Sequence, residues 1–324
     1  MELDYQAETE RVKMTTISSD TNHSRTLLPS PQQAWVHAVD SRRSLMAALQ
    51  DDTITAIETD LLMGRCTIES QSTIRRGVDS VQQQHQQDIP IMAHPPNTES
   101  DLSMLDFLQM VSRSNPQDQT GNDDNNTITK VIKLDFKQME TVEPTLKALV
   151  DNDANNNKFK TTDASAILLN ADILPGPGRR QPGIVTMHAS TFLETCIQYI
   201  TTQQQPSVRF AFSLGFKTDF TDTTGYTTED VQAMTDIIRQ YKLVDRWGVV
   251  LALNARLLEK SLSNFDSILE AFPSLQILVW TGKGEPPIPQ SLLVIIQNYY
   301  QDDMSHRIGY DCQVRDGEGL SGGR

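Results

Sequence analysis

Short β-rich runs alternate with helical patterns along most of this chain of 324 residues. The candidate strands are rich in Val, Ile, Leu and aromatic residues and lie at 35–38, 55–60, 89–93, 129–135, 166–170, 209–214, 248–254 and 275–280. Candidate helices follow most of them, at 41–50, 99–112, 140–150, 189–203, 228–241, 257–271 and 290–301. Parallel βαβ units alternate in this way, and eight of them close a cylinder. The pattern therefore predicts an α/β protein with a (β/α)₈ TIM-barrel fold.

A doubly wound open sheet would use the same alternation of strands and helices. That fold expects a glycine-rich phosphate turn after its first strand. This chain has His37-Ala38-Val39-Asp40 at that point, so the barrel is favoured. Ser41 and Ser100 are candidate helix N-caps, and the acidic residues after Thr227 suit the first turn of a helix.

Polar segments without periodicity interrupt the pattern. Residues 1–30 are predicted to be a disordered polar leader, and residues 313–324 a flexible tail. Between them, residues 31–312 are expected to form one barrel domain. Three further polar stretches are expected to be loop insertions, which cost little between secondary-structure elements, at 65–88, 115–127 and 151–163.

The composition limits the classes of partner. A formal net charge of −14 and a pI near 4.8 argue against binding of long nucleic acid, which relies on a broad basic surface, but not against a small anionic substrate. The three cysteines, Cys66, Cys196 and Cys312, are scattered and predict neither a disulfide framework nor a zinc site. No stretch approaches the roughly 18 apolar residues of a transmembrane segment and no leader resembles a signal peptide, so a cytoplasmic protein is expected. The oligomeric state stays open.

Four of the apolar runs end on residues suited to acid–base or metal chemistry. Side chains two residues apart on a strand point to the same face of the sheet. The acids of Glu58-Thr59-Asp60 therefore share one face of their strand, and so do the acid and the lysine of Asp135-Phe136-Lys137. The carboxyl ends of parallel barrel strands converge on one rim, where these folds keep their active sites. We therefore expect six side chains to meet there: His37, Glu58, Asp60, His94, Asp135 and Lys137.

Three carboxylates at one rim would repel each other, and a hard divalent cation with oxygen ligands relieves that repulsion. Glu58, Asp60 and Asp135 are therefore predicted to bind Mg²⁺ or Ca²⁺. His37 and His94 titrate near neutral pH, so one can accept a proton while the other donates one. Each of these features alone is more often structural, and it is the agreement of four strand ends that favours a site.

A second group of residues lies at or just past the predicted strand ends and is expected to bind substrate: Lys133, Asn170, Asp172, Ser213, Arg256, Trp280 and Lys283. Asn170 and Asp172 could equally satisfy backbone groups at the turn before Pro175, and Trp280 could pack the top of the barrel. The other histidines, His23, His85, His188 and His306, are given no role.

Several long motifs resemble the menorin family. They are WVHAVDS at 35–41, IETD at 57–60, PIMAHPP at 90–96, IKLDFK at 132–137 and LNADILPGP at 169–177, with FSLG at 212–215, GYT at 225–227 and WTGK at 280–283. The resemblance spans about residues 33–312. Menorin-like proteins in turn resemble the glycerophosphodiester phosphodiesterases and phospholipase C-like phosphodiesterases, a superfamily of (β/α)₈ barrels.

That second resemblance implies roles for the rim residues. Glu58, Asp60 and Asp135 would hold the metal, His37 and His94 would form the acid–base pair, and Lys137 would stabilise charge on the phosphoryl oxygens. The chain departs from the superfamily in three places: Ala38 stands where Arg is common, Pro95 where Asp is common, and Asp135 where Glu is frequent. One phosphate contact and one group that orients a histidine must therefore come from elsewhere.

The leading hypothesis is a metal-dependent phosphodiesterase that acts on a small phosphodiester. In the resembling superfamily a hydroxyl next to the phosphate often attacks and gives a cyclic phosphate, which favours a glycerophosphodiester-like substrate. A 2′,3′-cyclic phosphate or an RNA end is the alternative substrate. A hypothesis of another class is a catalytically inactive barrel that serves as a binding or scaffold protein.

Overall fold

The structure is a computed structural model, and it describes residues 33–68, 88–114, 130–154, 166–181, 183, 187–202 and 210–315. The predicted leader at 1–30 and the predicted insertion at 115–127 lie outside these residues. Most of the insertions at 65–88 and 151–163 lies outside them as well, as do residues 316–324 of the predicted tail. In the described part of the chain, no helix is long and apolar enough to cross a membrane.

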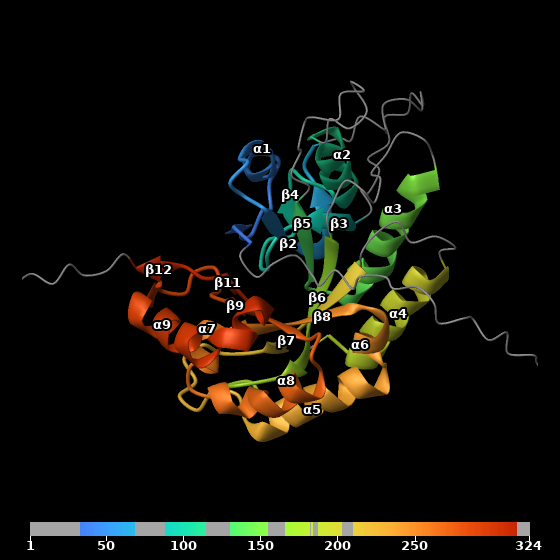
Figure 1. The fold of residues 1–324 in the computed structure, drawn as a ribbon. Helices are drawn as coiled ribbons and strands as arrows, with labels where there is room; N and C mark the ends of the chain where they lie inside the picture. Colours follow the sequence, from blue (N-terminus) through green and yellow to red (C-terminus); the bar gives the residue numbers. More distant parts are fainter. Residues whose placement is uncertain are drawn as a thin grey trace, which may run out of the picture.

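Eight parallel strands form the wall of a barrel (Figure 1). In hydrogen-bonded order they are β1 (Trp35–Val36), β2 (Ala56–Cys66), β5 (Val131–Phe136), β6 (Ala166–Pro175), β7 (Phe210–Lys217), β8 (Gly248–Asn254), β9 (Gln276–Trp280) and β11 (Ile308–Asp311). All neighbouring pairs in this order run parallel. The first and last strands, β1 and β11, lie next to each other without a hydrogen-bonded ladder among the described residues. The barrel is thus nearly closed, and the predicted TIM-barrel-like fold is confirmed.

Helices surround the strands (Figure 1). They are α1 (Arg42–Gln50), α2 (Met104–Ser114), α3 (Val142–Ala154), α4 (Ala189–Thr202), α5 (Thr228–Gln240), α6 (Leu243–Arg246), α7 (Ala255–Leu258), α8 (Asp266–Ala271) and α9 (Gln290–Tyr299), with 3₁₀ turns at Met139–Thr141, Leu262–Phe265 and Asp302–Arg307. The predicted caps at Ser41 and Thr227 are confirmed, because each side-chain oxygen accepts a backbone N–H of the first helical turn in a capping box.

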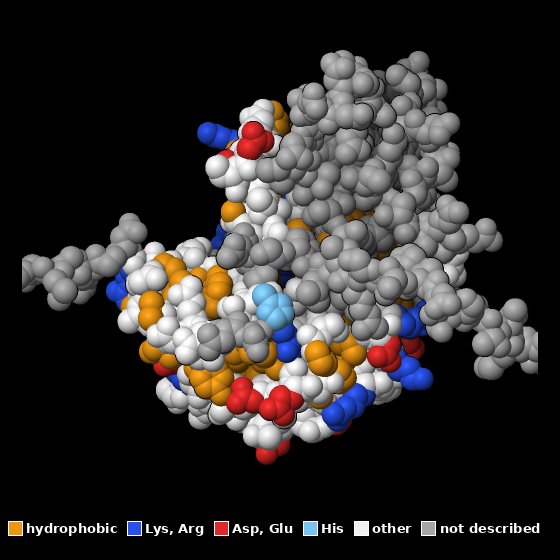
Figure 2. Space-filling view, in the orientation of Figure 1, with side chains coloured by type: hydrophobic (Ala, Val, Ile, Leu, Met, Phe, Trp, Pro, Cys, Tyr) orange, Lys and Arg blue, Asp and Glu red, His pale blue; other side chains and the backbone are white. Residues whose placement is uncertain are grey.

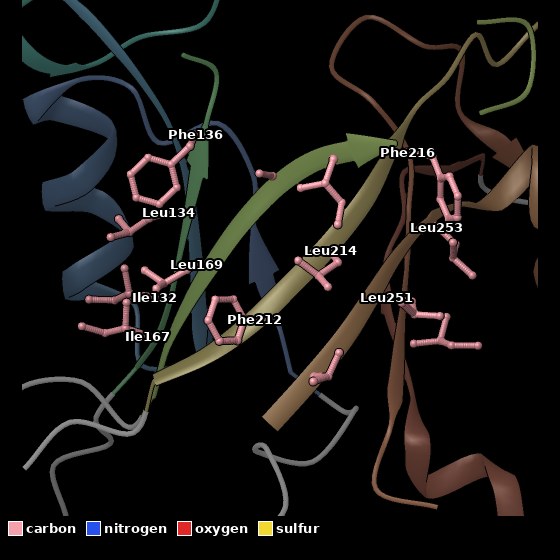
Figure 3. Packing of buried hydrophobic residues seen from close by; sticks show 14 of the residues in the cluster. Ile132, Leu134, Phe136, Ile167, Leu169, Phe212, Leu214, Phe216, Leu251 and Leu253 are labelled. Carbon is pink, nitrogen blue, oxygen red and sulfur yellow. The ribbon is translucent and has the colours of Figure 1, made fainter. Parts of the chain in front are cut away.

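Successive side chains of each barrel strand point alternately toward the surrounding helices and toward the inside of the barrel, so they pack in two separate apolar clusters. Ile132, Leu134 and Phe136 lie in a row along one face of β5, and Phe212 and Leu214 do the same on β7 (Figure 3). These residues belong to the large core beneath the helices. A second, separate cluster takes one residue from the early part of each of seven strands: Trp35, Ala56, Val131, Leu168, Ala211, Val250 and Leu278. Side chains from so many strands can meet only inside the barrel, so this cluster closes the interior below the polar residues described next.

The prediction that residues 89–93 form a barrel strand is wrong. Strand β3 (Ile89–Met92) runs antiparallel to the far end of β2 and lies outside the ring, and β4 (Glu99–Ser100) pairs in the parallel direction with the last residues of β2. The eighth barrel strand is β11, which the sequence analysis missed. A short apolar run does not reveal the direction of its partner, and β11 is only four residues long and contains Gly309.

The helix predicted at 99–112 begins later than expected. Ser100 is not an N-cap, because it lies in strand β4, before the start of α2 at Met104. Its Oγ donates to the carbonyl oxygen of Asp40. Ser103 takes that place, and its Oγ accepts the Asp106 backbone N–H at the start of α2. Near the C-terminus, β12 (Val314–Arg315) pairs with β10 (Ile288–Pro289), so the first residues of the expected tail are part of a small sheet.

Leu169 and Leu105 give a matched test of the barrel core. Leu169 on β6 is fully buried, whereas Leu105 on α2 is 45% exposed. Leu169→Ala should lower the free energy of unfolding by about 2–5 kcal/mol, because it removes buried apolar atoms and leaves a cavity. Leu105→Ala should change it by no more than about 0.5 kcal/mol. Denaturant unfolding measures both, and equal losses would contradict the assignment of Leu169 to the core.

Candidate metal and acid–base site

A polar cavity of ≈ 330 Å³ opens at the carboxyl ends of the barrel strands. Most of the side chains predicted from the sequence line it: His37, Asp60, His94, Lys133, Asp135, Lys137, Asn170, Asp172, Trp280 and Lys283. All but His94, which follows β3, come from five barrel strands and the turns after them, and Glu58 is buried next to the cavity without lining it. Their convergence has a simple cause. Each barrel-strand member of the set lies on the inward-facing alternation that begins with the apolar cluster at the barrel bottom.

Three carboxylates form the centre of the site. Glu58, Asp60 and Asp135 each offer an oxygen that lies within 4.8 Å of the other two. The ammonium of Lys137 lies 2.8 Å from Asp60 Oδ1 and 2.6 Å from Asp135 Oδ2. Asp60 Oδ2 is buried and has no hydrogen-bond partner among the described residues. Carboxylate oxygens, one of them left without a hydrogen-bond partner, are ligands that fit a hard divalent cation such as Mg²⁺ or Ca²⁺.

Burial and charge act against each other in this cluster. Burial raises the pKa of Asp60, and Lys137 only partly opposes that effect. Burial would also raise the pKa of Asp135, but Lys137 and Lys133 outweigh it and hold that pKa at about 2. Burial would lower the pKa of Lys137, yet Asp135, Asp60 and Glu58 raise it well above its usual value. The Lys137 ammonium and the Asp135 carboxylate are therefore both charged near neutral pH.

His37 is oriented by an acid that the sequence analysis missed. Its Nδ1 lies 3.1 Å from Asp311 Oδ2 and 3.4 Å from Glu58 Oε2. Glu58 Oε2 also accepts the backbone N–H of Ala38 at 2.7 Å, which fixes the carboxylate beside the ring. Burial lowers the pKa of His37, but the hydrogen bond to Asp311 and the charge of Glu58 outweigh it and raise the pKa above 6.5. Asp311 ends β11, so the missed strand also carried the missed residue.

His94 is oriented by a backbone carbonyl instead of a carboxylate. Its Nδ1 lies 2.6 Å from the carbonyl oxygen of Pro95. A carbonyl oxygen can only accept, so Nδ1 carries the proton and Nε2 of the neutral ring is an acceptor. The backbone N–H of Ala93 donates to the Asp60 carbonyl oxygen at 3.0 Å, which holds this turn against the barrel rim. His94 thus reaches the cavity from β3, although β3 is not a barrel strand.

Asn170 and Ser213 support the carboxylate cluster from below. Asn170 Nδ2 donates to Asp135 Oδ1 at 2.7 Å, and Ser213 Oγ donates to Asn170 Oδ1 at 2.6 Å. Ser213 is fully buried and does not line the cavity. This chain of hydrogen bonds leaves the second Asp135 oxygen facing Lys137. Ser213 is therefore placed to position Asn170 and not to touch a ligand.

Asp172 lies beyond Asn170 on the same face of β6. Burial raises its pKa to about 6, and the nearby negative charge of Asp135 adds to the effect. Gly215 on β7 makes room for this carboxylate, because a Cβ there would lie 2.5 Å from Asp172 Oδ1. The carboxyl group is thus enclosed at a point where it titrates close to neutral pH.

Arg256 does not reach the cavity, contrary to expectation. Its Nε lies 3.7 Å from Glu285 Oε2, and its Nη2 donates to the Pro286 carbonyl oxygen. Glu285 itself lines the cavity and accepts a hydrogen bond from Asn254 Nδ2 at 2.8 Å. Lys283 does line the cavity, and its Nζ lies 3.6 Å from Asp40 Oδ2. Arg256 therefore anchors the loop that carries Lys283.

Further residues of the cavity were missed by the sequence analysis: Lys217, Thr218, Phe220, Gly282, Gly284 and Glu285. Lys217 could have been found, since it continues the period-two series of Ser213 and Gly215 along β7. Ala252 on β8 was missed as well, although it lies two residues after the inward-facing Val250. The remaining residues lie in loops, where no periodicity points inward.

The histidines and cysteines without a predicted role also have places in the structure. His188 contacts Ser190 and Thr191 at the start of α4, and His306 precedes β11 at the other end of the barrel. His23 and His85 lie outside the described residues. Cys66, Cys196 and Cys312 are free thiols. On the face drawn in Figure 2, the described Lys and Arg side chains are interspersed with acidic and hydrophobic ones.

The fold and this cluster define an α/β barrel protein with a carboxylate-rich cavity at the carboxyl ends of its strands. Comparison with known sequences gives its family. The chain belongs to the menorin family: the family model of the menorin N-terminal domain matches residues 32–313. Protein FAM151B of Homo sapiens is 30% identical over 268 residues, which are 82% of this chain and 78% of that protein.

Two solved structures are remotely similar to the chain. Both are of oxaloacetate acetylhydrolase, one in complex with the product oxalate and one with the inhibitor 3,3-difluorooxalacetate. Each is 12% identical and covers 88% of this chain, with TM-scores of 0.42 and 0.41. The match extends over 77% and 76% of those chains.

Asp172 makes the free energy of unfolding depend on pH. Its folded pKa of about 6 lies above the ordinary value of 3.8, so the folded state binds the proton more tightly. The stability that this proton contributes is present below about pH 4 and is lost as the pH rises through about 6. Asp172→Asn removes this term. Between about pH 4 and 7 the wild type should therefore lose on the order of 1–3 kcal/mol more than the variant.

Denaturant unfolding across that pH range measures the difference. Asp245→Asn is the matched control, because Asp245 is an exposed acid on α6 and its removal should leave the pH profile of the wild type unchanged. Parallel profiles for the wild type and Asp172→Asn would contradict the raised pKa.

Proposed function

We propose that this chain is a metal-dependent phosphodiesterase that cleaves a small phosphodiester by histidine acid–base catalysis. The observation that carries the proposal is the single cavity lined by His37, His94, Asp60 and Asp135, with the buried Glu58 offering an oxygen within 4.8 Å of the other two carboxylates. Two imidazoles can transfer the protons, and a metal ion held by the carboxylates can neutralise the phosphoryl oxygens, when a hydroxyl attacks a phosphodiester.

Glu58, Asp60 and Asp135 are the residues that would hold the cation, either Mg²⁺ or Ca²⁺. Lys137 and Lys133 supply two positive charges near these three carboxylates, so one negative charge is not balanced by a lysine. The buried Asp60 Oδ2, which has no hydrogen-bond partner among the described residues, is available to a cation. A bound divalent cation would polarise the phosphoryl group and neutralise its oxygens. The lysines at the same rim would attract the phosphate by direct charge.

The two histidines differ in their surroundings, which supports different roles for them in the proposed reaction. His94 Nε2 is the acceptor of its neutral ring, so His94 is the general base that removes a proton from the attacking hydroxyl. His37 faces the Asp311 carboxylate through Nδ1, which stabilises the imidazolium, so His37 is the general acid. Asp311 is then a positioning residue for His37.

The reaction balances with a hydroxyl next to the phosphate. The substrate hydroxyl oxygen forms a bond to phosphorus while its proton passes to His94. The bond from phosphorus to the departing alkoxide breaks, and His37 protonates that oxygen. The products are a cyclic phosphate and an alcohol. Glycerophosphodiesters and ribonucleoside phosphodiesters both carry the required vicinal hydroxyl.

Substitution of either histidine should abolish most of the activity. His37→Ala and His94→Ala should each lower turnover about 10²- to 10⁴-fold, because each removes a proton-transfer group, while the fold is kept. His306→Ala is the matched control, since this exposed histidine lies at the other end of the barrel and its loss should leave the rate unchanged. Assays of purified variants on phosphodiesters with added Mg²⁺ or Ca²⁺ test this, and wild-type rates in either variant would refute the acid–base roles.

Removal of the carboxylates should remove the metal site. Glu58→Gln combined with Asp60→Asn should abolish binding of Mg²⁺ and Ca²⁺ in a calorimetric titration, because neutral amides replace two of three charged ligands. Asp245→Asn, which removes a remote surface acid, should bind as the wild type does. Unchanged affinity in the double variant would exclude Glu58 and Asp60 from a metal site. Silence of the wild type toward glycero-, sphingo- and cyclic ribonucleotide substrates would favour a binding protein over an enzyme.

A further inference from the structure

The outer part of the cavity has two aromatic walls that the acid–base chemistry does not use. Phe220 follows β7 and Trp280 ends β9, and both line the cavity. Strand β8 lies between those strands, and its neighbours on either side are β7 and β9. The two aromatic residues therefore belong to the strand ends on either side of β8.

No separate loop follows β8, because Asn254 ends the strand and caps α7 directly. The Asn254 side chain donates to Glu285 of the loop that follows β9. Ala252 is the β8 residue that lines the cavity, and a methyl group occupies little of it. Gly282, next to Trp280, also lines the cavity, and a Cβ there would lie 2.6 Å from Glu285 Oε1. Two small residues, Ala252 and Gly282, thus line the cavity together with the two aromatic residues, and this part of the cavity is called the recess below.

The charges around this recess favour an anionic ligand. Lys217 at the end of β7 and Lys283 in the loop after β9 are both exposed and both line the cavity. Two nearby acids are only partly hydrogen-bonded. Glu285 Oε1 accepts from Asn254 and Asp40 Oδ1 accepts the backbone N–H of Asp60, whereas Asp40 Oδ2 lies 3.6 Å from the Lys283 ammonium and Glu285 Oε2 lies 3.7 Å from Arg256 Nε. A flat, neutral group joined to a phosphate suits such a recess.

We propose that this recess, formed by Phe220, Trp280 and Ala252, is a subsite for the nucleobase of a ribonucleoside phosphodiester. The base stacks on the aromatic rings, and Lys217 and Lys283 attract its phosphates. Binding of the base does not depend on the reaction, but cleavage of the phosphodiester rests on the proposed function. In that reaction the ribose 2′-hydroxyl would be the attacking vicinal hydroxyl. A long acyl chain would need a longer apolar wall than two rings and a methyl group, and two lysines oppose a quaternary ammonium group.

Calorimetric titration of the full chain, with Mg²⁺ present, tests the subsite. The probes are adenosine 3′-monophosphate, glycerol 3-phosphate and glycerophosphocholine, each added to the His37→Ala variant so that no turnover is needed. The nucleotide should bind at least about tenfold more tightly than glycerol 3-phosphate. Trp280→Ala and Phe220→Ala should each weaken nucleotide binding about 5- to 150-fold, which is the range for loss of one stacked base, and leave glycerol 3-phosphate within about twofold.

Trp280→Phe is the conservative variant and should keep most of the nucleotide affinity, because a ring remains. Tyr299→Ala, which removes an exposed aromatic side chain from α9, should have no effect. Equal affinities for the nucleotide and glycerol 3-phosphate would overturn the subsite, and so would a preference for glycerophosphocholine. An equal weakening of both phosphates in Trp280→Ala would overturn it as well.

The subsite and the proposed function fail separately. Base-selective binding without hydrolysis of any phosphodiester by the wild type would support the subsite and reject the phosphodiesterase. Hydrolysis of glycerophosphodiesters without base-selective binding would support the phosphodiesterase and reject the subsite.

Discussion

The ammonium of Lys137, held between Asp60 and Asp135, is the interaction on which the mouth of this barrel depends. Three carboxylates with oxygens within 4.8 Å of one another repel strongly where water is largely removed. Without a cation, such groups take up protons instead of staying charged. Lys137 keeps Asp135 ionised, and Asn170 and Ser213 hold that carboxylate in place. The metal-binding and acid–base proposals both start from this balance.

The place where the barrel closes, between β1 and β11, is also the place where His37 contacts Asp311. Strand β1 has only two residues and forms no ladder with β11 in the described part of the chain. Side chains cross that seam instead, since His37 follows β1 and Asp311 ends β11, with 3.1 Å between Nδ1 and Oδ2. A backbone hydrogen-bond ladder would close the wall but would not orient an imidazole. The open seam therefore gives His37 its charged partner.

Loops after the strands give the cavity its asymmetry. The metal-cluster carboxylates, Lys137 and His37 belong to or follow β1, β2 and β5, and His94 follows β3, whereas Phe220, Trp280 and the exposed Lys217 and Lys283 belong to or follow β7 and β9. Strand β8 separates the strands that carry the aromatic residues and passes directly into α7. The chemistry and the proposed recognition of the substrate thus occupy different sectors of one rim.

The period-two pattern explains how much of the site was predictable. Glu58 with Asp60, and Asp135 with Lys137, are pairs whose spacing puts both members on one face of a strand, and the structure brings them together. Asp311 was missed because a four-residue strand with a glycine gives a weak signal. His94 reaches the cavity, but from an antiparallel strand outside the barrel, because an apolar run predicts a strand and not its partner.

By itself, the sequence determined the alternation of strands and helices, the inward face of each long strand and the carboxylates and lysine on it, since these follow from local periodicity. Only the tertiary structure decided which strand completes the ring, which acid faces His37 and why Arg256 holds a loop instead of the cavity. Those contacts join residues far apart in the chain, such as His37 and Asp311, and no local pattern records the register that brings them together.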